Sequence, residues 1–287
     1  MKVGVVYPQI ELGGSADAVR RIGEAVVGSG FDHLVAYDHV LGAVHADRTP
    51  PLTGPYTERD PFHDPFVMFA YLAGRHEDLG FATGILILPQ RQTVLVARQA
   101  ADLSLLSGGR FRLGIGTGWS PVEYDALGTD FASRGRRLDE QISLIRELWT
   151  GAVVDFDGVY DHVDRAALVP APESPPEIWI GGYTAPAHRR AARLGDGFIF
   201  AGGRGAIFEQ WDHVRALVAA HGRDPATFGG QFLVRGTGGP ADVAAKVEQW
   251  AERDGTHAAV VTMGLGLDST EAHVDYIGAV GQQLALG

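Results

Sequence analysis

The sequence predicts a single (β/α)8 barrel, the TIM-barrel fold. Eight apolar runs of strand length alternate with longer segments of helical period along the chain. The runs are apolar throughout rather than alternating with polar residues, which is typical of parallel strands covered by helices. The 287 residues suit one such barrel, and neither a repeat nor a linker divides them, so we expect one domain over residues 1–287. A doubly wound open sheet is the structural alternative.

Each predicted strand is followed by its own helix. The strands are expected at residues 2–8, 33–37, 79–89, 111–118, 177–182, 197–202, 230–236 and 257–264. The helices are expected at residues 15–30, 64–77, 93–109, 136–151, 185–195, 206–222, 240–255 and 269–285. In the first helix Ser15 is the expected N-cap, and Gly28 and Gly30 are stop signals.

Two connections are longer than a minimal barrel needs. Residues 42–63 form a long loop after the second strand, rich in Pro, Thr and charge. Residues 152–176, a small insertion after the fourth helix, predict a hairpin that turns at Asp157-Gly158. Both segments are compatible with plain surface insertions. The first follows a strand end, so we expect it over the catalytic face.

The composition excludes several classes of function. A net charge of −11 argues against nucleic-acid partners, because phosphate binding needs clustered Lys and Arg. The chain has no cysteine, and its eleven histidines show no metal-binding spacing, so no metal site is expected. No apolar run is long enough to cross a bilayer, and the N-terminus has no signal-peptide pattern. We therefore expect a cytoplasmic protein without membrane partners.

Asp38 and His39 directly follow the second predicted strand. In a barrel, functional side chains collect at the carboxyl ends of the strands, where these two residues lie. A carboxylate that caps a turn beside an exposed imidazole is an equally simple interpretation. From these residues alone, both interpretations stay open.

The ends of the fourth and fifth strands are rich in glycine. A dinucleotide fingerprint fails after the fourth strand, because its third glycine position falls on Trp119 or Pro121. After the fifth strand, Thr184 can cap the next helix, whose N-terminus offers unpaired N–H groups to an anion. Either end alone could be an ordinary turn. Two such ends on neighbouring strands favour one shared ligand that carries a phosphate.

Three stretches resemble the luciferase-like monooxygenase superfamily, and within it the branch of coenzyme F420 (deazaflavin)-dependent oxidoreductases. The resemblance covers about two thirds of the chain, from the first strand to about residue 203. It rests on "YDHVLG", "TGILILPQRQTVLVARQAADLSLLSGGRFRLGIGTGWSPVEYDALG" and "IWIGGYTAPAHRRAARLGDGF".

The resemblance implies a barrel that holds a flavin or deazaflavin in its mouth. It implies a non-proline cis peptide at Gly84–Ile85, facing the ring of the cofactor. It also implies that Asp38 lies close to the ring and that His39 acts as an acid or base. The cofactor-binding residues expected from it are Asp38, Gly84, Ile85, Gly116, Thr117, Gly118, Trp119, Gly181, Gly182, Tyr183 and Thr184.

One position departs from the pattern of this branch. The sugar-phosphate dehydrogenases carry a glutamate directly after the Gly-Thr-Gly of the fourth strand, where this chain has Trp119. The nearest acid, Glu123, stands four residues further on. This departure favours hydride delivery from reduced deazaflavin to an unsaturated substrate over sugar-phosphate oxidation.

The expected function is therefore an F420-dependent oxidoreductase that acts on a small organic molecule as a homodimer. An FMN-dependent luciferase-like monooxygenase is the first alternative, with FMN in place of coenzyme F420. A non-catalytic flavin- or deazaflavin-binding protein is the second. Oxygen consumption would distinguish the first alternative from the F420-dependent oxidoreductase. Cofactor binding without turnover would distinguish the second.

Overall fold

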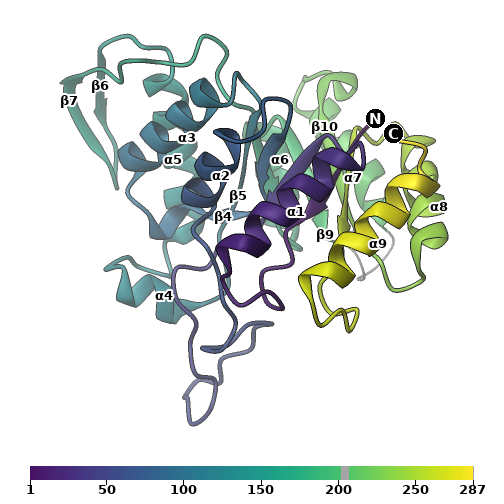
Figure 1. Ribbon diagram of the computed structural model, residues 1–287. Helices are drawn as coiled ribbons and strands as arrows, with labels where there is room; N and C mark the ends of the chain where they lie inside the picture. The colour runs from purple at the N-terminus through teal and green to yellow at the C-terminus, as the bar shows by residue number, and fades with distance from the viewer. Residues whose placement is uncertain (202–206, 287) are drawn as a thin grey trace.

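The computed structural model describes residues 1–201 and 207–286, and its main sheet is a closed barrel of eight parallel strands (Figure 1). Closure is made by the pairing of β3 with β5, which are the first and last of these eight strands in the order of pairing, and the two-residue strand Leu86–Ile87 extends the sheet beyond β5. The predicted (β/α)8 barrel is thus confirmed. The barrel strands are β1 (Lys2–Val6), β2 (His33–Ala36), β3 (Gly80–Thr83), β5 (Phe111–Gly116), β8 (Ile178–Gly181), β9 (Gly197–Ala201), β10 (Gly229–Arg235) and β11 (His257–Val261).

Within the described residues, eight helices surround the strands in the order that the sequence predicts. They are α1 (Ala16–Gly28), α2 (Pro65–Ala73), α3 (Thr93–Leu106), α5 (Arg134–Leu148), α6 (Ala185–Leu194), α7 (Ile207–Ala220), α8 (Pro240–Ala251) and α9 (Thr270–Gln283). Ser15 caps α1 by accepting a hydrogen bond from the Ala18 amide at 3.3 Å. No helix in the described part of the chain combines the length and apolar character that spanning a bilayer requires.

The structure differs from the expected elements at the third strand, at several helix ends and before α5. The strand expected at 79–89 is broken, because β3 is followed by a two-residue strand β4 (Leu86–Ile87) and a 3-10 turn η1 (Leu88–Gln90). Helix α2 ends four residues early, before its C-cap Gly74, and α8 also ends four residues early, at Ala251. A short helix α4 (Pro121–Ala126) was not predicted, since six residues are too few to show a helical period. Gly202 and Ala206, the ends of two predicted elements, lie outside the described residues.

The insertion after α5 folds as a hairpin, as predicted, but it turns over residues 158–161 rather than at Asp157-Gly158, because Asp157 pairs with His162. Strands β6 (Val154–Asp157) and β7 (His162–Ala166) pair antiparallel, with an irregular register between Val154 and Phe156. A second 3-10 turn, η2 (Pro225–Thr227), precedes β10. In Figure 1 the hairpin lies at the edge of the molecule, away from the long loop after β2.

The barrel interior is a small apolar core, separate from the larger core between strands and helices. Trp179 is the largest side chain in it and is 1% exposed. A Cβ at Gly197 or Gly229 would lie 2.5 or 2.1 Å from the indole ring, so glycine at both positions makes room for it. The remaining inner residues are Val6, Val35, Ala82, Ile199, Leu233, Ala259, Val261 and Met263. The interior is therefore filled by side chains, which leaves the ends of the strands for chemistry.

Candidate active site

The carboxylate of Asp38 is buried just beyond the end of β2 and is fully paired. One oxygen accepts a hydrogen bond from the Ile87 amide at 2.9 Å, and the other binds the guanidinium of Arg91 at 2.7 Å. Arg91 also reaches Asp64 at 3.2 Å. Burial raises the pKa of the Asp38 carboxyl, while Arg91 and the Ile87 amide act against that rise.

These contacts fix the segment that follows β3. Asp38 holds the segment at Ile87, the Gly84 amide donates to the Ala36 carbonyl at 2.7 Å, and Thr83 donates its hydroxyl hydrogen to the Gly114 carbonyl at 2.6 Å. Between them lies the Gly84–Ile85 peptide bond, which is cis, as the family resemblance implied. Strands β2 and β5 therefore hold this bond in place from both sides.

The side chain of Ile85 explains two of the predicted glycines. A Cβ at Gly116 would lie 1.9 Å from Ile85 Cδ1, and a Cβ at Gly181 would lie 2.6 Å from Ile85 Cγ2. Gly116 ends β5 and Gly181 ends β8, so Ile85 packs on bare backbone at the carboxyl ends of two paired strands. Gly118 adopts a φ of +62°, which favours glycine at that position for backbone reasons.

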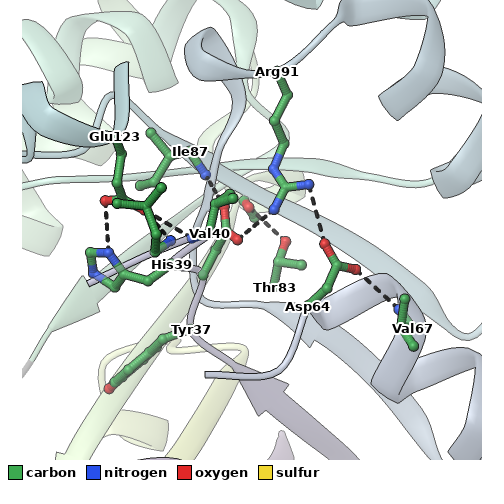
Figure 2. A network of polar contacts seen from close by, with 12 residues as sticks. Tyr37, His39, Val40, Asp64, Val67, Thr83, Ile87, Arg91 and Glu123 are labelled. Atoms are coloured by element: carbon green, nitrogen blue, oxygen red, sulfur yellow. Dashed lines mark hydrogen bonds and ion pairs between the residues drawn. The ribbon is translucent and has the colours of Figure 1, made fainter. Parts of the chain in front are cut away.

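His39 forms a close pair with Glu123, a residue of α4 (Figure 2). The imidazole Nδ1 lies 2.9 Å from Glu123 Oε2. The other carboxylate oxygen accepts hydrogen bonds from the amides of Val40 at 2.8 Å and Leu41 at 3.4 Å. Because both side chains are largely buried, the pair fixes the ring and leaves Nε2 as the nitrogen that Glu123 does not contact.

Aromatic rings surround His39. Its ring centroid lies 4.9 Å from that of Phe62, 5.3 Å from that of Tyr56 and 5.5 Å from that of Trp119. Phe62 and Tyr56 belong to the long loop 42–63, which therefore packs on the candidate catalytic residue. The indole of Trp119 lies against Gly54 of the same loop, where a Cβ would come within 2.1 Å of the ring.

The hydroxyl groups of Ser120 and Thr184, near the expected phosphate position, are available to a ligand. Ser120 precedes α4, and its Oγ is buried without a hydrogen-bond partner among the described residues. Thr184 is the N-cap residue of α6, yet its side chain makes no capping hydrogen bond. The buried, unpaired hydroxyl of Ser120 carries a desolvation cost that a phosphate oxygen would remove, whereas the exposed hydroxyl of Thr184 is simply free to donate to one. The residues present therefore fit a ligand that carries a phosphate.

Comparison with known proteins identifies the family. Residues 4–235 match the family described as luciferase-like monooxygenase. The chain belongs to this family. An uncharacterized protein of Mycobacterium tuberculosis is 35% identical over 186 residues, which cover 63% of this chain and 64% of that protein. An F420-dependent glucose-6-phosphate dehydrogenase of Gordonia bronchialis is 36% identical over 155 residues, or 52% of this chain and 46% of that one.

These alignments span less than two thirds of either relative. Among solved structures, monooxygenase RslO1 from Streptomyces bottropensis superposes on the luciferase-like chain with a TM-score of 0.80. The superposition covers 99% of both chains at 18% identity. At that identity the likeness shows the fold alone.

The predicted site residues of this luciferase-like barrel fall into three groups. Asp38, Gly84, Ile85, Gly116 and Gly181 meet around the segment after β3, through the contacts described above. His39 and Trp119 meet under the long loop. The remaining predicted residues lie in the loops before α4 and α6, namely Thr117, Gly118, Gly182, Tyr183 and Thr184.

Sequence reasoning missed Arg91 as the partner of Asp38 and Glu123 as the partner of His39. The pattern Ser120-Pro-Val-Glu123 is typical of a capping box, in which the glutamate folds back onto its own helix. In the structure Glu123 instead reaches across to His39. Arg91 stands 53 residues from Asp38, and no local pattern signals such a pair.

Proposed function

We propose that this protein is an F420-dependent oxidoreductase that uses reduced deazaflavin to deliver hydride to an unsaturated small organic substrate. The observation that carries the proposal is the His39–Glu123 pair, next to the buried Asp38–Arg91 pair at one strand end. An imidazole oriented by a buried carboxylate is suited to proton transfer. The 36% identical F420-dependent relative supports deazaflavin as the cofactor.

The cofactor phosphate would be held by two loops at the carboxyl ends of β5 and β8. Thr117 and Gly118 precede Ser120, and Gly182 and Tyr183 precede Thr184, so each loop places an unpaired hydroxyl, that of Ser120 or of Thr184, close to a glycine with positive φ. The N-terminus of α6 adds its dipole to the second loop. Ile85, with Gly84, would face the ring, and Trp119 would border it.

Reduced deazaflavin, once bound, supplies the hydride. His39 would supply the proton from Nε2 as an imidazolium, whose Nδ1–H donates to Glu123 at 2.9 Å. Glu123 acts as a positioning residue that orients the ring and whose negative charge favours this protonated form. Asp38 would position the segment that carries Ile85, and its closeness to the ring stays a prediction. The loop rings of Tyr56 and Phe62 would keep water away from His39.

The surroundings of His39 favour an apolar, unsaturated substrate over a sugar phosphate. Phe62, Tyr56 and Trp119 give the histidine aromatic neighbours on several sides. Such walls bind flat, conjugated molecules by apolar contact, whereas a sugar needs many polar partners. Because Trp119 takes the position of the glutamate in sugar-phosphate dehydrogenases, the same conclusion follows from the sequence.

An FMN-dependent monooxygenase is the second candidate function. Its support is the name of the family, luciferase-like monooxygenase, which matches residues 4–235. The same two loops would then hold the phosphate of FMN. The two candidates differ in their use of oxygen, because reduced deazaflavin does not activate it.

Anaerobic turnover tests the proposal. Purified protein is mixed with reduced F420 and a panel of conjugated enones, enoic acids and quinones, and deazaflavin absorbance is followed. Oxidation of the coenzyme that depends on substrate, without oxygen, is the expected result. Turnover only with reduced FMN and oxygen would support the monooxygenase instead. Cofactor binding without turnover, both with reduced F420 and with reduced FMN and oxygen, would indicate a non-catalytic binding protein.

A further inference from the structure

A groove rich in arginine lies beside helix α6, outside the barrel. It encloses about 340 Å³ and is lined by Asp139, Pro186, Arg189, Arg190, Arg193 and His221. Its lining carries three guanidinium groups and one carboxylate, which leaves two positive charges with the histidine neutral. The whole chain has a net charge of −11. A positive groove on so acidic a protein indicates an anionic ligand.

The charges of the groove are only partly compensated. Asp139 accepts from both Arg190 and Arg193, and Arg190 also donates to the Gly135 carbonyl at 3.0 Å. Arg189 makes no hydrogen bond or ion pair with any described residue. Among the arginines that the structure describes, it shares that condition only with Arg235. Arg189 and one of the two arginines on Asp139 therefore remain available to an external anion.

The groove begins where the proposed cofactor phosphate would end. Pro186 lines it and lies in the first turn of α6, two residues after Thr184. From Pro186 the arginines follow at helical spacing down to Arg193, a distance of about 10 Å along the helix axis. Three residues of extended chain span about the same length. An anionic chain that continues from the phosphate would thus meet the arginines in turn.

We infer that this arginine groove binds the acidic chain of the deazaflavin coenzyme, an inference that rests on the proposed function. Coenzyme F420 continues beyond its phosphate as a chain of glutamates, each with a free carboxylate. FMN ends at the phosphate and has no group for the groove. Arg189 and Arg193 pair with carboxylates of the chain, and Arg190 stays with Asp139. The groove therefore contributes to the choice of deazaflavin over FMN.

The test compares two forms of the coenzyme, with and without the glutamate chain, by fluorescence titration. The variant Arg189→Gln/Arg193→Gln removes two charges from the groove. The variant Arg215→Gln/Arg253→Gln removes two from other surface ion pairs, with Asp254 and Asp212, and is the matched control. Thermal unfolding checks that all three proteins are folded.

We expect the unchanged protein and the control to bind the full coenzyme roughly 3- to 10-fold more tightly than the chain-free form. The groove variant should bind both forms equally, and 0.5 M salt should reduce the difference in the unchanged protein. Equal binding of both forms by the unchanged protein, or a difference that persists in the groove variant, would overturn the inference while leaving the proposed function intact. Binding of neither form would refute the proposed function, and the inference with it.

Discussion

At the scale of single residues, the site is organised by two carboxylates with different tasks. Both carboxylate oxygens of Asp38 have partners, Arg91 and the Ile87 amide, so Asp38 stabilises the structure of the site. Glu123 holds the amides of Val40 and Leu41 with one oxygen and His39 with the other. In the proposed function, His39 therefore transfers the proton and Glu123 positions its ring.

Replacing His39 by Ala should lower turnover by ~10²-fold or more, because the proton donor is lost. Affinity for the cofactor should stay within a few-fold, since the phosphate loops are untouched. His162→Ala, an exposed histidine of the β7 strand, is the matched control. Steady-state kinetics and a binding titration check both numbers. Unchanged turnover would remove His39 from the mechanism.

Replacing Glu123 by Gln should lower kcat by roughly 10- to 100-fold while the protein stays folded. The amide oxygen of Gln can still accept from the Val40 amide, but its neutral NH2 group then faces Nδ1 and can neither accept the Nδ1–H nor stabilise the charge of the imidazolium that donates from Nε2. Glu123→Ala leaves the Val40 amide unpaired and should also destabilise the fold by about 1–3 kcal/mol. Equal kcat values for Glu123→Gln and the unchanged protein would contradict the positioning role.

At the scale of elements, the site depends on how the segment after β3 sits against β5 and β8. Gly116→Ala should cost about 1–3 kcal/mol of unfolding free energy, because its Cβ overlaps Ile85 Cδ1. The double variant Gly116→Ala/Ile85→Ala should lose at least about 1 kcal/mol less unfolding free energy than the two single variants lose together. Urea unfolding measures all three variants. Strict additivity would show that the two residues do not compete for space.

The strands and helices could be predicted from the sequence wherever the pattern of apolar residues marks their ends. Each barrel strand is an apolar run ended by Gly or a polar residue, so all eight were found. The break between β3 and β4 was missed because only Thr83 and Gly84 interrupt the middle of the apolar run 79–89, and so short an interruption does not end a strand by hydrophobicity alone. Helix α4 was missed because six residues make less than two turns.

The candidate site was predictable only in part, for a related reason. Asp38 and His39 follow a strand end, and that position could be inferred from the chain alone. Their partners Arg91 and Glu123 come from other elements, and each pair exists only once the barrel has closed. The partner of the Glu123 carboxylate could not be predicted from the sequence, because a local capping box and a distant imidazole compete for the same carboxylate.

At the scale of the whole molecule, the amino end of the barrel buries two histidines that bear on stability. His33 begins β2 and His257 begins β11, with ring centroids 5.7 Å apart. Burial, assisted by the charge of Arg112, lowers the pKa of His257 to about 2 and lowers that of His33 well below its usual value. Both rings are therefore neutral in the folded barrel.

The unfolded chain binds protons at these histidines below about pH 6.5, and the folded barrel does not. The free energy of unfolding should therefore fall as the pH falls from 6.5, by up to about 1.4 kcal/mol per pH unit for each histidine. The raised pKa of Asp38 acts in the opposite sense. Comparison with His33→Asn isolates the histidine contribution, because Asn does not titrate.

Urea unfolding between pH 7 and pH 5 should show a shallower pH dependence for His33→Asn than for the unchanged protein. His162→Gln, on the exposed hairpin, should leave the dependence as it is. Identical slopes for the unchanged protein and His33→Asn would mean that His33 does not stay neutral in the folded barrel.

The measurement that tests the central claim most directly is a side-by-side fluorescence titration of the purified protein with coenzyme F420 and with FMN. The account predicts micromolar binding of F420 and much weaker binding of FMN. Tighter binding of FMN would contradict the account, move the function to a flavin monooxygenase and give His39 and Glu123 a different task.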